Sequence, residues 1–307
     1  MSRSDGVLAS VSDWFDDVLW DNLPAMPLGT WFADIVNWCK VELRSLFRSL
    51  SDGIESLVDG LTDVLTFLPS VVMVLLFAGL ALWLKGWKFG LTTLLTFLIV
   101  AWTPFWEQSM MTLALVLVAS ALALLLAIPI GVLASENPWV SKVTKPVLDL
   151  MQTMPAFVYL IPAISFFSVG VVPGVVATVV FCMPPGVRLT ELGLRQVDKE
   201  VVEAGESFGA SPATILGRIK LPLALPTIMA GVNQVIMLAL SMVVIAGMVG
   251  GDGLGKVIMS ALNNVDLATG FNAGLAVVII AIFLDRISHA IGSRTRVARA
   301  QNAMARD

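Results

Sequence analysis

Residues 109–133 read SMMTLALVLVASALALLLAIPIGVL, a run of 25 residues without a charged side chain. A helix that crosses the hydrocarbon core of a bilayer needs about 20 mostly apolar residues, so this run is long enough. Inside a bilayer, a helix satisfies its backbone hydrogen bonds within one segment. The run therefore predicts a transmembrane α-helix.

The composition of the whole chain agrees with a membrane protein. Of the 307 residues, 57% are hydrophobic and 14% are charged, whereas soluble domains carry about 25% charged residues. The net charge of −4 and the lack of a dense basic face exclude a nucleic-acid binder. Cys39 and Cys182 lie too far apart for a disulfide scaffold. Because His289 is the single histidine, we expect no metal site and no catalytic residue.

Six further runs are apolar enough to cross the membrane. The seven expected spans are residues 66–84, 89–105, 109–133, 153–170, 171–187, 223–249 and 267–284. Pro173 and Gly174 are expected to form the turn between the fourth and fifth spans. We therefore expect an all-α integral membrane protein with about seven transmembrane helices and a membrane domain over residues 66–285.

Residues 1–65 form an acidic, tryptophan-rich tail. They hold eleven acidic residues against four basic ones, and four tryptophans. Over residues 30–65 apolar residues recur at helical spacing, but charges interrupt the pattern too often for a span. The pattern fits amphipathic helices in the membrane interface, and equally a small helical cap outside the membrane. The first 20 residues lack the apolar region of a signal peptide.

The basic residues predict the orientation. Cytoplasmic loops carry an excess of Lys and Arg. With the N-terminus outside, fourteen of the nineteen basic residues lie inside and five outside. We therefore expect the N-terminus outside and the C-terminus inside, with residues 286–307 as a basic cytoplasmic tail.

The longest inner loop, residues 188–222, is predicted to form two short helices outside the bilayer. Residues 197–208 are compatible with a helix, and Gly209 supplies a stop. Ser211-Pro212 suits the N-cap and first position of a second helix, which Leu221-Pro222 is expected to end. Small residues near the bend would let the backbone of a partner approach closely.

This loop resembles the EAA loop of permease subunits of ABC importers. Its pattern is Glu203-Ala204-Gly205, three residues, Gly209, nine residues, Ile219, one residue and Leu221-Pro222, with Gly205 in place of the usual second alanine. Similarity to permeases for glycine betaine, proline betaine and choline lies in residues 148–162, 188–190, 193–197, 273–276 and 284–287. The resemblance covers about residues 65–292.

The resemblance implies that the loop docks in a cleft of a cytoplasmic ATPase. The implied coupling residues are Glu203, Ala204, Gly205, Glu206, Gly209, Ile219, Leu221 and Pro222. It implies a permease for a quaternary amine in a bacterial cytoplasmic (inner) membrane, served by an extracytoplasmic substrate-binding protein. One set of spans and one loop make a homodimer the economical assembly. ATP and Mg would bind the ATPase, so we expect no cofactor and no hydrolysis on this chain.

Residues 250–257 almost spell a phosphate-binding P-loop. Val257 stands where Ser or Thr would bind Mg²⁺, and the segment lies on the expected outer side. We expect a glycine-rich outer loop or a re-entrant segment instead, with Gly251 and Gly253 as candidate gate residues.

Polar residues of the sixth expected span are candidates for the solute pathway. They are Asn233, Gln234 and Ser241, and the spacing puts Gln234 and Ser241 on one face of a helix. Polar groups at membrane depth usually face the bundle interior. The alternative is hydrogen bonding between helices.

The fourth expected span supplies further candidates. Pro155 and Pro162 would bend the helix and suit a gate. Tyr159 and Phe166 offer ring faces that attract quaternary ammonium groups. The commoner role of aromatic residues in a span is packing or contact with lipid.

Two other classes of protein stay open. A secondary transporter would need ionisable groups inside the spans, and the expected spans contain none in their interiors. A membrane scaffold would leave the coupling loop idle. Co-purification with an ATPase separates the three classes. A permease for another small amino-acid-like solute also stays open, because a binding protein would select the solute.

Overall fold

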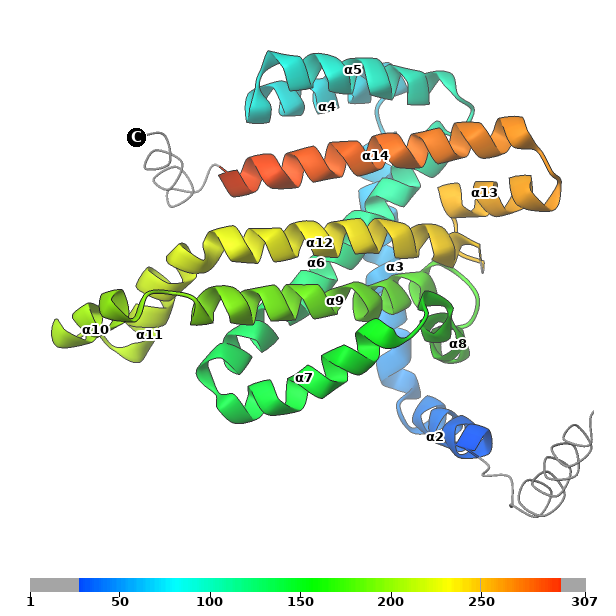
Figure 1. Cartoon of the computed structure of the whole chain (residues 1–307). Coiled ribbons are helices and arrows are strands. Elements are labelled where there is room, and N and C mark those ends of the chain that lie inside the picture. The colour runs from blue at the N-terminus through cyan, green and yellow to red at the C-terminus, as the bar shows by residue number, and fades with distance from the viewer. Residues whose placement is uncertain (1–27, 249, 294–307) are drawn as a thin grey trace, which may run out of the picture. The chain divides into compact units, whose positions relative to one another are not determined.

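The computed structural model describes residues 28–248 and 250–293, and every secondary-structure element in these ranges is helical (Figure 1). The helices are α2 (Leu28–Glu42), α3 (Arg44–Thr66), α4 (Ser70–Lys85), α5 (Trp87–Trp102), α6 (Trp106–Glu136), α7 (Pro138–Thr153), α8 (Ala156–Phe167), α9 (Val171–Arg195), α10 (Lys199–Ser207), α11 (Pro212–Ile215), the π-helical turn η2 (Leu216–Lys220), α12 (Leu221–Gly247), α13 (Leu254–Asn263) and α14 (Leu267–Ser293). Helix α2 belongs to one unit of the chain and the helices from α3 onward to a second.

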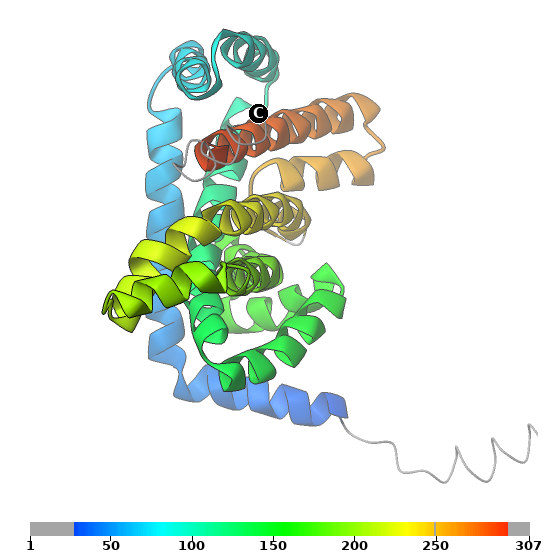
Figure 2. The ribbon, with the colours of Figure 1, turned by 60° about the vertical axis from the view of Figure 1, so that its left-hand side comes forward.

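Helix α9 is the centre of the second unit, because it packs along both α6 and α12. Helix α14 lies on α12, and the α4–α5 hairpin packs against α14 (Figure 2). Phe77, Phe97 and Phe283 join α4, α5 and α14 through ring contacts of 4.9–5.3 Å between centroids. The core is therefore continuous from the central helices to the hairpin.

Small residues let α9 approach its neighbours closely. A Cβ atom on Gly131 of α6 would lie 2.7 Å from the carbonyl oxygen of Val187 and 2.6 Å from Cβ of Thr190. A Cβ atom on Gly186 would lie 2.9 Å from Cβ of Ala127. Such contacts hold helices together in a bilayer, where apolar burial between helices gives little drive because lipid is equally apolar.

The all-helical membrane fold expected from the sequence is confirmed, with four to six candidate spans in place of about seven. Within residues 28–248 and 250–293, four helices are long and apolar enough to cross a membrane: α6, α9, α14 and the continuous helix Pro212–Gly247. The pairs α3–α4 and α7–α8, bent by 98° and 100°, add up to two more. Helix α5, with 16 residues, is shorter than a full span.

The fourth expected span is broken rather than straight. Helix α8 has only 12 residues, because Pro155 precedes its first turn and Ser168 ends it in the left-handed region, with φ +66°. The turn before α9 lies at residues 168–170, so the turn expected at Pro173 and Gly174 is wrong. Pro173 instead fits the first turn of α9, where its missing N–H has no intrahelical partner to lose.

Helix α3 packs against the membrane helices although it is amphipathic. It runs crosswise to α9, α12 and α14 (Figure 1). Ile54, Val58 and Leu65 are buried in the same core cluster as α6 and α9. Phe47 stacks on Phe166 of α8 at 4.7 Å between ring centroids. Helix α3 therefore contributes to the core of the second unit.

The close approach of α6 and α9 predicts that valine is tolerated at one glycine of the bundle and not at another. Gly131→Val should destabilise the protein by about 1–3 kcal/mol, because the added methyl groups would overlap the α9 backbone. Gly79→Val on α4 is the matched control, since nothing lies within 4 Å of its Cβ position. Thermal unfolding in detergent, followed by size-exclusion chromatography, measures both. Equal midpoints for the two variants would contradict the close crossing.

Candidate functional site

A helical hairpin projects from one end of the bundle, which we call the hairpin end (Figure 1). Asp198 caps α10 by accepting a backbone N–H at 3.0 Å, and Ser211 caps α11 in the same way at 3.3 Å. Gly209 lies between the two helices with φ +77°, a conformation that favours glycine. Pro212 occupies the first turn of α11. The helix–turn–helix expected in residues 188–222 is confirmed.

The expected end of this motif at Leu221-Pro222 is wrong. The backbone N–H of Leu221 bonds to the carbonyl of Leu216, five residues back, and α12 then continues without a break. A proline inside a regular helix removes a hydrogen bond and clashes with the carbonyl four residues earlier. The single π-helical turn before Pro222 changes that register, so the proline sits at the start of α12.

Gly205 holds the hairpin together from inside. A Cβ atom at this position would lie 2.7 Å from Cδ1 of Ile219 and 3.7 Å from Cγ1 of Ile215. The glycine therefore lets α10 lie directly on the second arm of the hairpin. Small residues near the bend were expected to let a partner approach. At Gly205 the space is taken by Ile219 of the same chain.

Other coupling candidates lie on the outside of the hairpin. Glu203, Ala204, Glu206 and Gly209 are exposed. Phe208 was not expected as a site residue, yet its side chain is 92% exposed at the end of α10. The sequence could have indicated this residue, because Phe208 is a large apolar residue next to Gly209, where the first helix was expected to stop. The hairpin thus offers a partner an aromatic ring flanked by carboxylates.

Both roots of the hairpin are tied to the last turn of α6. Arg195, at the end of α9, donates through Nη2 to the carbonyl of Ala134 at 2.8 Å. Lys220, at the end of η2, pairs with the carboxylate of Glu136 at 2.8 Å. The carbonyls of the last helical turn lack partners within the helix, so Arg195 also caps α6.

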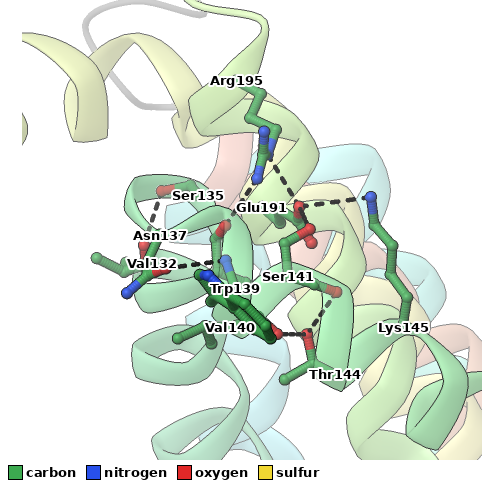
Figure 3. A network of polar contacts seen from close by, with 11 residues as sticks. Val132, Ser135, Asn137, Trp139, Val140, Ser141, Thr144, Lys145, Glu191 and Arg195 are labelled. Carbon is green, nitrogen blue, oxygen red and sulfur yellow. Dashed lines mark hydrogen bonds and ion pairs between the residues drawn. The ribbon is translucent and has the colours of Figure 1, made fainter.

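Glu191 lies beside this anchor and is buried (Figure 3). Its carboxylate accepts a hydrogen bond from Ser141 of α7 at 2.7 Å, and lies 2.9 Å from Nε of Arg195 and 3.9 Å from Nζ of Lys145. A pocket of about 400 Å³ opens here, lined in part by Arg188, which pairs with Asp149. Hydropathy ended the expected span at residue 187, whereas α9 continues through Glu191 to Arg195.

The aromatic pathway candidates lie in two separate packing environments. Tyr159 is 8% exposed, donates its hydroxyl to the carbonyl of Met151 and contacts Phe181 edge-on at 6.0 Å between centroids. Phe166 stacks on Phe47 of α3. The structure does not bring the two rings together, and their role in a pathway stays a prediction.

The polar candidates of α12 divide into two groups. Asn233 donates to Oδ1 of Asp285 at 3.2 Å, lies 3.0 Å from Nε2 of His289 and accepts from Ser288. Asn233 therefore joins α12 to α14. This contact corresponds to the alternative role, hydrogen bonding between helices. Gln234 and Ser241 share an exposed face of α12.

The gate candidates lie at helix breaks. Pro155 marks the 100° bend between α7 and α8, and Pro162 lies inside α8. Gly253, with φ +86°, passes over Thr112 so closely that a Cβ atom would lie 2.6 Å from its hydroxyl oxygen. That oxygen accepts the backbone N–H of Leu254 at 2.8 Å and fastens the start of α13 to α6.

The loop around Gly251 and Gly253 borders a pocket lined by both polar and apolar side chains. The pocket, of about 550 Å³, lies between α3, α6 and α13. Lys256 pairs with Asp252 at 2.8 Å, and this hydrogen bond raises the pKa of the lysine. In the described part of the chain, no group of three or more His, Cys, Asp or Glu side chains is placed to hold a metal ion.

The comparisons with known proteins identify the class. Residues 123–297 match the family described as "Binding-protein-dependent transport system inner membrane component". The chain is 46% identical over 271 residues to the glycine betaine transport system permease protein OpuAB of Bacillus subtilis (strain 168), which covers 88% of this chain and 96% of that protein. It is 41% identical over 271 residues to the glycine betaine/proline betaine transport system permease protein ProW of Escherichia coli (strain K12), covering 88% of this chain and 77% of that protein.

This chain belongs to the family of inner membrane components of binding-protein-dependent transport systems, and it is a multi-pass membrane permease. Its fold is also similar to a chain of the MetNI methionine ABC transporter in inward-facing conformations. The TM-score is 0.56 at 21% identity, covering 60% of this chain and 92% of that chain.

The contact under Gly205 predicts how the hairpin responds to bulk. Gly205→Val should push α10 away from Ile219 and make the amides of residues 199–220 exchange several-fold faster, because the loop opens more often. Gly217→Val is the control, since nothing lies within 4 Å of its Cβ position. Hydrogen–deuterium exchange in detergent measures both. Equal exchange in the two variants would contradict the packing role of Gly205.

Proposed function

We propose that this chain is the permease subunit of an ATP-driven importer for glycine betaine or a related quaternary amine, and that it works with a cytoplasmic ATPase. The observation that carries the proposal is the exposed hairpin with the EAA pattern, continuous with α9 on one side and α12 on the other. The relatives at 41–46% identity are permease proteins for glycine betaine or proline betaine. ATP and Mg²⁺ bind to the partner, and this chain contributes no hydrolysis.

The hairpin suits the transmission of a movement. Its two arms are packed on each other through Gly205 and Ile219, so a partner that pulls on it displaces α9 and α12 rather than unfolding the loop. Phe208 provides an exposed aromatic anchor of the kind that carries binding energy in protein interfaces. Rigid-body movement of packed elements is one of the known ways in which a local change is transmitted through a protein.

A second copy of the chain completes the proposed pathway. Gln234, Met237 and Ser241 form an exposed stripe along the middle of the helix Pro212–Gly247. Polar side chains at membrane depth face a bundle interior or a water-filled cavity rather than lipid. In a homodimer this stripe would face the partner across the solute path. An external binding protein delivers the solute and selects it.

A quaternary ammonium group has no N–H to donate, so its path needs ring faces or other weak attractors. Aromatic rings attract such a group by about 0.5–2 kcal/mol per contact. In this proposal Tyr159 and Phe166 supply ring faces to the solute pathway, and Gln234 and Ser241 supply polar groups. Weak contacts of this size ease passage without trapping the solute.

Uptake by reconstituted vesicles tests the proposal. The permease, with its ATPase and binding protein, should take up radiolabelled glycine betaine only when ATP is supplied on the hairpin side. Ionophores that collapse proton and sodium gradients should leave the rate unchanged. Uptake that needs an ion gradient and no ATP would contradict the proposal and favour a secondary transporter.

A matched pair of phenylalanines isolates the hairpin contact. Phe208→Ser should weaken ATPase co-purification roughly 30-fold, as expected for loss of an interface anchor of about 2 kcal/mol. Phe271→Ser, at an exposed site near the start of α14, is the control and should co-purify normally. Equal recovery of the ATPase with both variants would remove Phe208 from the contact.

The orientation is a separate part of the proposal. In a background without Cys39 and Cys182, a cysteine at Ser4 should react with an impermeant thiol reagent on intact cells, and a cysteine at Ser293 should not. The basic residues gathered at one side of the expected spans give the reason. Labelling at residue 293 without labelling at residue 4 would invert the topology.

A further inference from the structure

Glu191 is an unusual residue for its surroundings. Among the residues that the structure describes, it is the only charged one that is buried, with 5% of its surface exposed. Burying an ionised carboxylate is costly unless it is paired and hydrogen-bonded. Glu191 has both kinds of partner: the Ser141 hydroxyl at 2.7 Å, and the cations of Arg195 and Lys145.

The partners of Glu191 lie on two helices, α9 and α7. Arg195 is four residues after Glu191 on α9 and three residues before the N-cap of α10. The same guanidinium holds the carbonyl of Ala134 on α6. Ser141 and Lys145 lie on α7. Glu191 therefore connects the entry of the hairpin, the end of α6 and the first half of α7 at one point (Figure 3).

From α7 the connection reaches the bent segment in the membrane domain. Helix α7 ends at Thr153, and α8 follows after the 100° bend at Pro155. The hydroxyl of Tyr159 on α8 donates back to the carbonyl of Met151 on α7. A displacement of α7 is thus passed to α8 across the bend. The backbone alone would leave the two helices free to hinge there.

We propose that Glu191 is a positioning residue that fixes α7 and the α7–α8 bend to the movement of the coupling hairpin. This inference rests on the proposed function, because it assigns a route for work that the ATPase supplies. The other ionic link from the hairpin, through Lys220 and Glu136, joins η2 to the last turn of α6. Without the charge of Glu191, Arg195 keeps its bond to Ala134, while the first half of α7 loses its ionic contact with α9. Among the described residues, only the ion pair of Asp149 with Arg188 then remains between the two helices, toward the other end of α7. When the hairpin moves, α9 and α12 move with it, but α7 follows them only in part.

The experiment measures the ratio of ATP hydrolysed to solute imported in reconstituted vesicles. Glu191→Gln keeps the shape and a hydrogen-bond acceptor for Ser141 but removes the charge. The ratio should rise about fivefold or more, the lower end of typical coupling effects, while ATPase co-purification and basal hydrolysis stay within twofold. Glu107→Gln, an exposed glutamate in the first turn of α6, is the matched control and should leave the ratio unchanged.

A second variant covers the case in which Glu191→Gln fails to assemble. Ser141→Ala removes only the neutral hydrogen bond on the α7 side and leaves the ion pair with Arg195, so the ratio should rise about two- to threefold. An unchanged ratio in the assembled variants overturns the inference. Uptake, hydrolysis and assembly falling together in both variants also overturns it, because that pattern marks a merely structural role.

The wild-type protein separates this inference from the proposed function. If the wild-type complex imports the solute with ATP and Glu191→Gln keeps the same ratio, only the role of Glu191 fails. If the wild-type complex shows no ATP-dependent import of any quaternary amine, the proposed function itself fails.

Discussion

The packing of α9 between α6 and α12 is the constraint on which the other features depend. Helices in a bilayer gain little from burying apolar surface against each other, so close contact of small residues has to supply the attraction. Gly131 and Gly186 provide it toward α6, and Gly193 and Gly231 provide it toward α12, where added Cβ atoms would lie 3.0 Å from Thr227 and Leu189. Because these surfaces interlock, the three helices resist gradual deformation where they touch. The hairpin is continuous with two of them, α9 and α12.

Local rules predicted the parts of the hairpin that depend only on neighbouring residues. The stop at Gly209, and the start of the second helix at Ser211 and Pro212, follow from cap chemistry and backbone freedom, which act over a few residues. The end expected at Pro222 was wrong, because one π-helical turn accommodates the proline, and no local pattern announces such a turn. The packing role of Gly205 depends on Ile219, fourteen residues away, which spacing alone did not reveal.

The long-range polar contacts escaped prediction for a related reason. Hydropathy places a span end where charge begins, so Glu191 fell in the expected inner loop and Asp285 directly after the last expected span, and the spans seemed free of ionisable groups. The helices instead continue beyond those points, and the charges find partners on other helices: Ser141 on α7 for Glu191, and Asn233 on α12 for Asp285. Burial and partner together decide whether a charge can stay in a helix, and both are properties of the folded bundle.

The location of these charges also bears on how work can pass through the protein. An interlocked apolar core resists gradual deformation, so change concentrates where packing is interrupted. The described chain has two such places along the route, the π-helical turn before α12 and the bend at Pro155. Ionic contacts at helix ends tolerate small shifts better than interlocked small residues, since charges attract over several ångströms. Joints built from Glu191 and Lys220 can therefore stay connected while the helices they join change their relative positions.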